Sequence, residues 1–581
     1  MRSRRWNILP ADEAAALELA RELNTSVVTA QVLMNRGLVL PQACRSFLNP
    51  QLRDLADPML IPGLPKAAER VAKAIKDKQK IVIYGDYDVD GITATSILWH
   101  AIKLLGGDVH YYIPHRVDEG YGLNSEAIVS LCEQGAGLII TVDCGVTAVE
   151  PVDAANQRGV DVIISDHHEW RDQLPKAFAI VHPRLPCEGE PYPNPHLCGA
   201  GVAFKLAWGI GMQMGSGGRV PEAMKWFLVD ATALAALGTI ADVVPLVGEN
   251  RVLARFGLGG LKQTKLQGIK ALIAGAQLDG QNIDSYHVGF LLAPRLNACG
   301  RMGHAKLAVE MLTDASEARA IEIATYLETQ NRQRQSVERG IVEEAMELAN
   351  ELGDTSADSR AIVVAKKGWH QGVIGIVASR LVDKFNKPTV IITLDEDGTG
   401  HGSARSIQGF HLAKAFNACG EHLQRHGGHE MAAGLAMAPG KFEDFRAAFR
   451  AHAQSSIQTE QLVPSINVDC VTTLDQVSEA LVSEMDRLGP FGNGNPRPLL
   501  ACRDLTLTAA PRRVGKNGDH LQLFLRQGDH YMKAIAFNAA SMIDKLEAGK
   551  PISLAVQPQL NEYNGRISVE LEVKDIQVSS S

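Results

Sequence analysis

Between residues 80 and 170, short apolar runs rich in Ile and Val alternate with longer segments of helical patterning. Strands separated by helices of this length form parallel βαβ units, because a parallel connection needs a crossover of about a dozen residues or more. The runs are apolar on both faces, which is typical of strands buried between two helix layers. The pattern predicts a parallel α/β sheet with these strands and helices in order: KIVIYG, 91–105, DVHYYIP, 124–134 capped by Asn124, GLIITVDCG, 147–157 and VDVIISDHH.

Outside this stretch the patterning changes several times along the chain. The first 60 residues look helical with proline breaks, 200–275 are largely helical, and 305–353 carry one long helical pattern. Strand and helix patterns then resume, and from about 462 short alternating segments at regular spacing favour a small β-barrel. We therefore expect an α/β multidomain protein with five parts: a helical N-terminal extension (1–60), a first α/β domain (61–304), a connecting helix (305–355), a second α/β domain (356–455) and a C-terminal barrel (462–581).

Composition narrows the function classes only a little. A chain of 581 residues with 45% hydrophobic and 21% charged residues is ordinary for roughly three or four globular domains. The formal net charge is -8, so a nucleic-acid partner would have to be met by local basic patches rather than by a global field.

The cysteines and the apolar runs indicate a cytoplasmic protein. Nine scattered cysteines without a C-x-x-C pair fit a reducing compartment and argue against a disulfide scaffold or a zinc ribbon. The N-terminal stretch has basic residues but no apolar core after them, and no run approaches the ~18 apolar residues of a membrane span. We expect no membrane association. The sequence also has no G-x-x-x-x-G-K-[ST] loop, so we expect no ATP motor.

The first predicted strand ends in the stretch YGDYDVDG, in which Asp86, Asp88 and Asp90 are two residues apart and Gly91 follows. Three like charges this close repel one another unless a cation holds them. A calcium EF-hand loop is rejected, because its twelfth position needs Glu and is Ile97 here, inside a predicted helix. A solvated acidic turn remains the alternative.

Further metal-binding residue types stand at the ends of other predicted elements: Asp143 after one strand, Asp166-His167-His168 after another, and Asp242 after an apolar helix. In open parallel sheets, ligands bind outside the carboxyl ends of the strands, so these side chains are expected to converge. Taken singly, each has a simpler explanation. Asp143 could cap the following helix, Asp242 could be a helix-end acid, and the histidines could form a surface pair. Their joint placement favours a metal site.

The residue types select the metal and the reaction. Carboxylates with an imidazole suit manganese, with magnesium as a weaker match, whereas thiols would suit zinc. Four aspartates and a histidine are too many for one open catalytic ion and fit two ions about 3.5–4 Å apart that share a carboxylate. Such a pair activates a water for displacement at phosphorus, so the predicted substrate is a phosphoester or a phosphoanhydride.

These stretches resemble the DHH phosphoesterase superfamily, named for the triplet that stands here at residues 166–168. Within it, the chain is similar over essentially its whole length to the bacterial single-strand-specific DNA exonuclease family. Ten stretches in family order carry the resemblance: YGDYDVDGITAT, IPHRVDEGYGLN, ITVDCGV, IISDHHE, LCGAGVAFKL, TIADVVPL with EN following, PRLNACGRMG, GVIGIVASRL, GSARS and GGHEMAAG. The resemblance implies a DHH catalytic domain, a DHH-associated second α/β domain and an oligonucleotide-binding (OB) fold for the barrel.

The resemblance also implies residue roles. The expected metal ligands are Asp88, Asp90, Asp143, His167 and Asp242. Asp86 would lie close to them, and His168 would face the scissile phosphate as an acid or charge stabiliser. The contacts to substrate phosphates that the resemblance implies are Ser403, Arg405 and His429, joined by Arg116 from the first domain in holding the 5′ end. Arg301 is added as an expected contact from its local sequence.

The local sequence around several of these residues supports a phosphate role. Arg405 follows a glycine and a serine, which leaves room for a guanidinium to contact phosphate in a bidentate manner. The GGH stretch ending at His429 would let backbone approach an anion closely, although a plain tight turn has the same sequence. Arg295 and Arg301 flank LNACG, and the neighbouring glycines favour Arg301. Aromatic and basic residues also occur in the barrel, but alternating aromatics are more often core, so no barrel residue is assigned.

The family resemblance implies degradation of single-stranded DNA from its 5′ end to mononucleotides, in DNA repair and recombination. Without a motor of its own, the enzyme would work with a helicase and a single-strand-binding protein. Two alternatives stay open at this point. One is a phosphodiesterase of the same chemistry acting on short oligonucleotides, cyclic dinucleotides or pyrophosphate, and the other is a non-enzymatic single-strand-binding scaffold.

Overall fold

The computed structural model describes residues 4–115, 122–170, 173–187, 189–301, 304–563 and 565–578. The chain folds into two compact units, each built from separate parts of the sequence. The first unit comprises Leu40–Asn331 and Arg487–Arg497, and the second comprises Met1–Val39, Arg332–Asp486 and Pro498–Ser581. The boundaries of the five parts expected from the sequence stay predictions.

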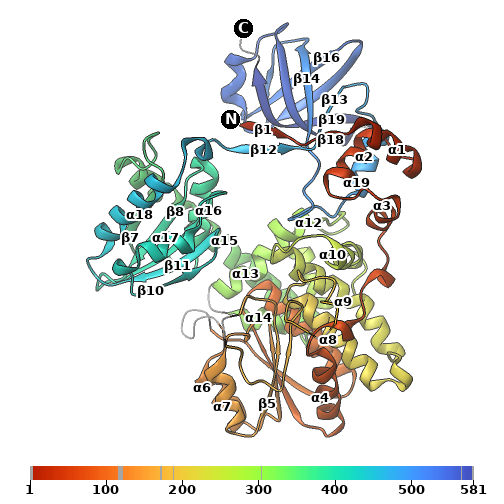
Figure 1. Cartoon of the computed structure of the whole chain (residues 1–581), viewed down its shortest axis with the longest axis vertical. Helices are drawn as coiled ribbons and strands as arrows, with labels where there is room; N and C mark the ends of the chain where they lie inside the picture. Colours follow the sequence, from red (N-terminus) through yellow and green to blue (C-terminus); the bar gives the residue numbers. More distant parts are fainter. Residues whose placement is uncertain are drawn as a thin grey trace. The chain divides into compact units, whose positions relative to one another are not determined.

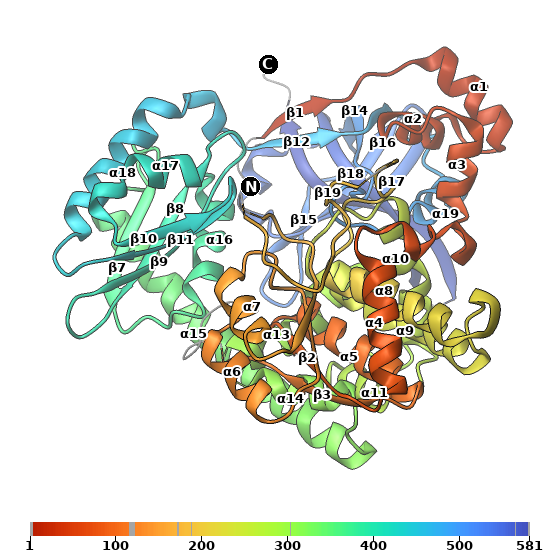
Figure 2. The ribbon, with the colours of Figure 1, turned by 60° about the horizontal axis from the view of Figure 1, so that its bottom comes forward.

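A five-stranded sheet of order β3-β2-β4-β5-β6 forms the centre of the first unit, and all its pairings are parallel, as predicted. Alternate residues of each strand face opposite layers. Ile81 and Ile83 join the large core with α5 and α8, whereas Val82 and Tyr84 pack with α6 and α7. Figure 1 shows α6 and α7 on one side of this sheet and α4 on the other, and Figure 2 shows α4 running beside α8. The strands are β2 (Lys80–Gly85), β3 (Asp108–Tyr112), β4 (Leu138–Val142), β5 (Asp161–Ser165) and β6 (Ala179–Val181).

The one helix start predicted from a capping residue is confirmed, whereas the helices predicted over 91–105 and 147–157 begin at Val89 and Val149. The confirmed helix is α6, whose N-cap Asn124 accepts hydrogen bonds from the backbone N–H groups of Glu126 and Ala127. The α-helices of this unit up to the long α15 are α3 (Pro41–Leu48), α4 (Leu64–Lys76), α5 (Val89–Leu104), α6 (Ser125–Glu133), α7 (Val149–Asn156), α8 (Gly199–Met214), α9 (Glu222–Ala241), α10 (Gly248–Leu261), α11 (Gln267–Gly275), α12 (Ser285–His287), α13 (Ala293–Arg301) and α14 (Ala305–Leu312).

Helix α9 is long and apolar enough to cross a membrane by length and composition, and 56% of its apolar 18-residue stretch is buried within the protein. It packs against α5, α8 and α10. This burial is what is expected of a core helix.

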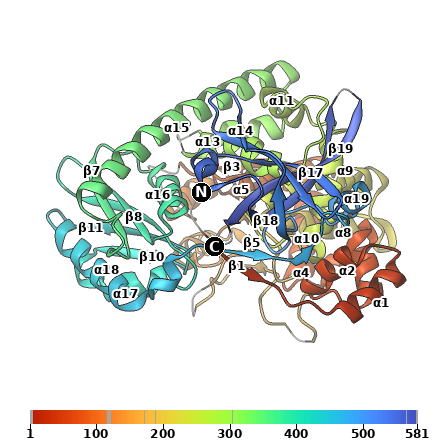
Figure 3. The same ribbon diagram turned by 90° about the horizontal axis from the view of Figure 1, so that it is seen from above.

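The predicted connecting helix is two helices, α14 and α15 (Glu317–Glu351), separated by residues 313–316. Helix α15 is one long helix of 35 residues, visible along its length in Figure 3, and it passes from the first unit to the second between Asn331 and Arg332.

The second unit contains a mixed sheet of order β10-β11-β9-β8-β7, in which only β7 and β8 are parallel. Helices α16 and α18 accompany it, so the second α/β domain is present. Its elements are β7 (Ile362–Lys367), α16 (Ile374–Phe385), β8 (Thr389–Leu394), β9 (Gly400–Arg405), α17 (Leu412–Ala418), β10 (Arg425–Gly428), β11 (Ala432–Met437) and α18 (Phe442–Ser456).

The C-terminal segments form the predicted barrel. A seven-stranded sheet of order β13-β14-β18-β19-β17-β16-β15 closes on itself through an additional pairing of β14 with β16. Helix α19 (Glu479–Arg487) lies between its first two strands in the sequence. The strands are β13 (Cys470–Thr472), β14 (Leu500–Leu507), β15 (Arg512–Val514), β16 (His520–Gln527), β17 (His530–Ala536), β18 (Pro551–Tyr563) and β19 (Arg566–Val578).

The N-terminal extension is not wholly helical, so that prediction was wrong in part. Helices α1 (Glu13–Leu23) and α2 (Val27–Asn35) follow the pattern, but Arg5–Ile8 is a strand, β1. It pairs in parallel with β12 (Ser465–Val468), and Trp6 Nε1 donates to Asp575 Oδ2 at 2.7 Å. A four-residue strand whose partner is some 460 residues away leaves no local periodicity to detect.

Candidate metal centre

The acids that follow the strands lie side by side because the sheet register aligns them. Gly85 of β2 pairs with Val142 of β4, and Val142 pairs with Ser165 of β5. The next residue of each strand is therefore Asp86, Asp143 or Asp166, at the carboxyl edge of three adjacent strands. The expected convergence at the sheet edge is present.

Asp88 and Asp90 reach the same edge from the start of α5. Asp88 is the N-cap, and its Oδ1 accepts the N–H groups of Asp90 at 2.9 Å and Gly91 at 3.1 Å. Asp90 is buried and accepts the first N–H groups of α8, from Gly199 at 2.6 Å and from Ala200 at 2.8 Å. The positive ends of two helices thus stabilise these carboxylates.

Among the described residues, three overlapping groups could each hold a metal ion, because the possible ligand atoms within each group lie within 4.8 Å of one another. His167 links two of them: its Nε2 is 3.1 Å from Asp143 Oδ1 and 3.7 Å from both Asp90 Oδ2 and Asp242 Oδ2. All five expected ligands are therefore brought together in one unit. The groups are Asp143 with His167 and His168, Asp90 with His167 and Asp242, and Asp86 with Asp88 and Asp143.

The simpler explanations for single residues do not account for this arrangement. The N-cap of α7 is Ala148, so Asp143 does not cap the helix that follows it. Asp242 is the C-cap of α9, but a carboxylate at a helix C-terminus is unfavourable and its side chain lies beside His167. Asp86 is buried, which excludes a solvated acidic turn.

The electrostatics of the cluster match a cation site. Burial and the neighbouring carboxylates raise the pKa of Asp143 well above its usual value, burial also raises the pKa of Asp90, and burial with Asp90 and Asp88 raises that of Asp242 to about 8. Burial lowers the pKa of His167 to about 4, so its imidazole is neutral and can bind a metal. Within the described part of the chain, buried Asp143 Oδ1 and His167 Nε2 have no hydrogen-bond partner. Divalent ions would satisfy these oxygen and nitrogen atoms and remove the repulsion.

His168 is held differently from His167. Its Nδ1 lies 2.8 Å from Asp166 Oδ1, which also accepts the backbone N–H groups of both histidines, while Asp166 Oδ2 accepts that of Val146. Burial opposes charge on both groups, but the hydrogen bond and mutual attraction outweigh it, raising the pKa of His168 to about 9 and lowering that of Asp166 to about 2. A protonated, 40% exposed imidazole therefore stands at the edge of the cluster.

Close packing around the acids depends on glycines that sequence reasoning did not single out. A Cβ on Gly199 would lie 2.6 Å from the side chain of Asp143, and one on Gly238 would lie 2.6 Å from Asp90 Oδ1. Asp143 itself has φ 61°, a left-handed conformation that aspartate tolerates better than most residues. In the sequence, the glycines in LCGAGVAF and ALGTIAD are the signal that could have indicated this close packing.

In the second unit, Ser403 and Arg405 lie together on β9. Arg405 Nη1 donates to Ser403 Oγ at 3.1 Å and to the carbonyl of Ala404 at 2.8 Å, and among the described residues no carboxylate pairs with it. Burial lowers the pKa of Arg405. A Cβ on Gly375, in the first turn of α16, would lie 2.9 Å from Ser403 Oγ and 3.1 Å from Arg405 Nη2, so a helix N-terminus adjoins both side chains. This combination suits an anion.

His429 belongs to the same end of that sheet. Its N–H donates to the carbonyl of Ala432 at 2.8 Å, and Ala432 pairs with Arg405 across β11 and β9. The structure thus gathers Ser403, Arg405 and His429 within the second unit.

The two remaining expected phosphate contacts are Arg116 and Arg301. Arg116 lies outside the described residues, and for Arg301 the description covers the backbone at the end of α13 but not the side chain. Arg295 Nε lies 2.8 Å from Glu328 Oε2 in an ion pair, so this arginine already has an acidic partner. Asn297, also on α13, accepts the N–H of Val89 at 3.2 Å and so ties this helix to the acidic loop.

Three family models match the chain in the order of its folded parts. The DHH family N-terminal domain matches residues 80–239, the DHHA1 domain 358–455 and the RecJ OB domain 468–575. The single-stranded-DNA-specific exonuclease RecJ of Bacillus subtilis is 39% identical over 99% of this chain and 71% of its own length. The chain belongs to the RecJ family. The RecJ proteins of Escherichia coli and Thermus thermophilus are 33% and 32% identical, covering 89% and 92% of this chain and 90% and 75% of their own lengths.

Solved structures of the RecJ family have the same fold. The Mn²⁺ complex of RecJ from Thermus thermophilus matches with a TM-score of 0.84 and 29% identity, covering 100% of this chain and 81% of its own. The Mg²⁺ complex matches with a TM-score of 0.77 and 27% identity, covering 99% and 79%. The expected family, α/β multidomain fold and OB-type barrel are confirmed.

Proposed function

We propose that this protein is a metal-dependent exonuclease that hydrolyses single-stranded DNA from the 5′ end to mononucleotides. The observation that carries the proposal is the buried cluster of acids around His167 in a chain of the RecJ family. Its relatives are named single-stranded-DNA-specific exonucleases, and the barrel matches the RecJ OB model. The expected setting is DNA repair and recombination.

The proposed ligands are those expected from the sequence, and two divalent ions are proposed, manganese in preference to magnesium. The ligands are Asp88, Asp90, Asp143, His167 and Asp242. Bound there, the ions would supply an activated water and charge neutralisation for displacement at phosphorus. Asp86, which is buried beside Asp88 and Asp143, supports the cluster through the hydrogen bond from Tyr87 N–H to its Oδ1.

We propose that His168 is the proton donor or charge stabiliser of this centre. The hydrogen bond between Nδ1 and Asp166 Oδ1 fixes the orientation of the ring, and the proposed nitrogen that faces the substrate is Nε2. With a pKa near 9, the imidazole is protonated at neutral pH and can stabilise charge on a phosphate oxygen or donate a proton to the leaving oxygen. Asp166 acts as its positioning residue.

Substrate capture is assigned to Ser403, Arg405 and His429, with Arg116 and Arg301 as further phosphate contacts. Arg405 is half-buried, its hydrogen-bond partners are neutral, and a helix N-terminus lies beside it. These features suit a phosphate contact better than a surface ion pair with a carboxylate. The barrel would bind the strand by stacking and by basic residues, as OB folds do. A helicase and a single-strand-binding protein are proposed as partners that supply the single strand.

The proposal is tested with a long single-stranded DNA carrying a 5′-phosphate and a label at either end. We expect mononucleotides to be released from the 5′-labelled end first, in Mn²⁺ and more weakly in Mg²⁺, with no product in chelator. A duplex of the same sequence and a set of di- to pentanucleotides serve as comparisons. Faster hydrolysis of the short substrates would favour the oligonucleotide phosphodiesterase, and binding without cleavage in Mn²⁺ would favour a scaffold.

A further inference from the structure

The segment Arg487–Arg497, just before the barrel strand β14, folds with the first unit although the rest of its surroundings in the sequence belongs to the second. It contacts the turn that directly follows Asp242. We propose that this segment is a brace that positions Asp242 and thereby sets the affinity of the metal centre. The inference deepens the proposed function and rests on it.

The contact between brace and turn is a two-sided hydrogen-bonded pairing centred on Asn493. Its Nδ2 donates to the carbonyl of Val243 at 2.8 Å, and its own carbonyl accepts the N–H of Leu246 at 2.8 Å. The glycines on either side allow the close approach. A Cβ on Gly492 would lie 2.7 Å from Leu246 Cδ1, and one on Gly494, where φ is +69°, would lie 3.0 Å from Pro245 Cβ.

The turn needs such support because its backbone is strained. Val243 has φ 59°, and a β-branched residue is a rare occupant of this left-handed region. Conformations of this kind persist only where the surroundings hold them. Asp242 is the C-cap of α9 and immediately precedes Val243, so the strained turn is bonded directly to the residue whose carboxylate lies 3.7 Å from His167.

The brace is itself anchored to α10, the helix that begins where the turn ends. Arg251 is buried, and its guanidinium donates to the carbonyls of Leu488 at 2.7 Å and Arg487 at 3.2 Å, while Arg255 donates to the carbonyl of Gly489 at 3.1 Å. Asn495 ties the brace to itself through the carbonyls of Leu488 and Pro490. The brace is therefore hydrogen-bonded both to the turn and to α10, the helix that follows the turn. A segment that only connected two domains would not need these bonds.

Two substitutions in the full-length protein test the brace. Asn493→Ala removes the donor to Val243, and Gly494→Ala adds a methyl group against Pro245. Gln281→Ala is the control, because Gln281 is an exposed amide of the same unit that donates to the carbonyl of Gln277 at 3.0 Å. Mn²⁺ binding is measured directly from the electron paramagnetic resonance of free Mn²⁺, beside the melting temperature and single-strand hydrolysis as a function of Mn²⁺ concentration.

We expect Asn493→Ala to weaken Mn²⁺ binding at one site about fivefold, the effect of losing one ordinary hydrogen bond. Gly494→Ala should weaken it further. Excess Mn²⁺ should restore kcat, KM for DNA should not change, and Gln281→Ala should match the wild type. Restoration of kcat by excess Mn²⁺ would show that the substitution affects the positioning of a metal ligand and not the structure in general.

Three results would bear against these claims in different ways. If the wild type binds Mn²⁺ and cleaves DNA while Asn493→Ala has an unchanged binding isotherm, the brace is refuted and the proposed function stands. If Asn493→Ala loses melting temperature and activity together and excess Mn²⁺ restores neither, the segment is only structural and the inference also fails. If the wild type neither binds Mn²⁺ nor cleaves DNA, the proposed function fails and the inference fails with it.

Discussion

Mn²⁺ is expected to raise the melting temperature of this protein more at pH 8 than at pH 6. The reason is that the metal and protons compete for the same buried carboxylates. In the metal-free protein, the pKa of Asp242 is raised from 3.8 to about 8, and burial also raises those of Asp90 and Asp143. At pH 6 Asp242 holds a proton that Mn²⁺ must displace, whereas at pH 8 Asp242 is half ionised.

The sign follows from proton linkage. Because the folded pKa of Asp242 lies above its unfolded value, the metal-free folded state binds more protons than the unfolded state between about pH 4 and pH 8. Its stability therefore falls as the pH rises through this window. Mn²⁺ removes that loss by binding the ionised form, so its stabilising effect increases with pH.

The magnitude can be bounded. Displacing one proton costs about 1.4 kcal/mol for each pH unit below the pKa, which makes the difference between pH 6 and pH 8 up to about 2.7 kcal/mol per proton. The first unit has about 300 residues, for which an unfolding entropy of about 2.1 cal/mol/K per residue gives about 1.6 °C of melting temperature for each kcal/mol. The extra shift should therefore be about 4 °C at most for each proton displaced. The assay is a melting curve with and without saturating Mn²⁺ at both pH values, supported by calorimetry in two buffers of different ionisation enthalpy to count released protons.

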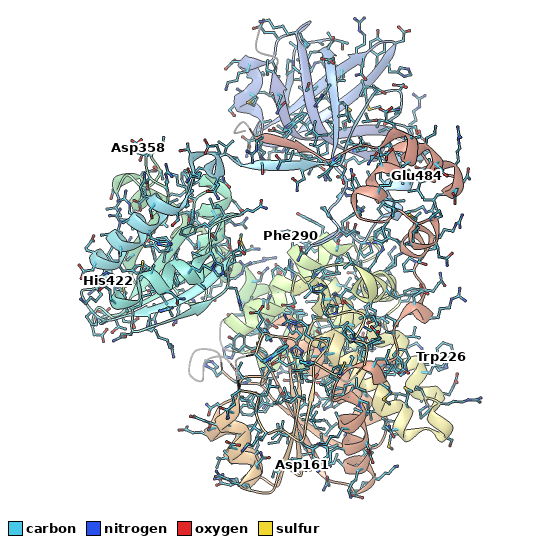
Figure 4. The ribbon with its side chains drawn as sticks, in the orientation of Figure 1. Asp161, Trp226, Phe290, Asp358, His422 and Glu484 are labelled. Carbon is cyan, nitrogen blue, oxygen red and sulfur yellow. The ribbon has the colours of Figure 1, made fainter. Side chains whose placement is uncertain are left out.

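A matched control lies at the other end of β5. Asp161 starts this strand, pairs with Arg70 at 2.6 Å and is labelled at the bottom of Figure 4, so Asp161→Asn should keep the pH-dependent Mn²⁺ shift. Asp242→Asn should reduce it. If Mn²⁺ raised the melting temperature equally at pH 6 and pH 8, and the heat of binding did not depend on the buffer, Mn²⁺ and protons would not compete for these carboxylates.

The other predictions concern catalysis and substrate capture. Asp143→Ala should abolish hydrolysis but leave single-strand binding, measured by fluorescence anisotropy, largely intact, since the metals act on the chemistry more than on docking. Arg405→Ala should weaken strand binding and flatten its salt dependence by about 0.7 in the logarithmic slope, the value for one lost phosphate contact on a single strand. Asp166→Asn should remove the partner that holds the pKa of His168 near 9, so the alkaline limb of the pH–rate profile should move toward about 6.5.

Each of these predictions has a result that contradicts it. Normal turnover by Asp143→Ala would remove this residue from the metal centre. For Arg405, the exposed Arg425 of β10 is the control, and equal salt slopes for the two alanine variants would argue against a specific phosphate contact. An alkaline limb that stays in place in Asp166→Asn would show that His168 does not set it.

Much of the fold was predictable because the signals are local. Strands such as Ile81–Ile83 are apolar on both faces, and helices such as α6 carry their cap in the sequence, so periodicity and capping located them. The candidate ligands were also found from residue type and position, because a parallel sheet brings the carboxyl ends of its strands to one edge.

What the sequence by itself determined is therefore the set of elements, the acids and histidines at their ends and, through family resemblance, the class of chemistry. The tertiary structure alone decided how these groups act on one another: His168 against Asp166, Gly199 and Gly238 beside the acids, and Asn493 against the turn after Asp242. The physical reason is that periodicity and capping depend on neighbours along the chain. A pKa or a hydrogen bond depends on neighbours in space, and Asn493 and Val243, for example, are 250 residues apart in the sequence.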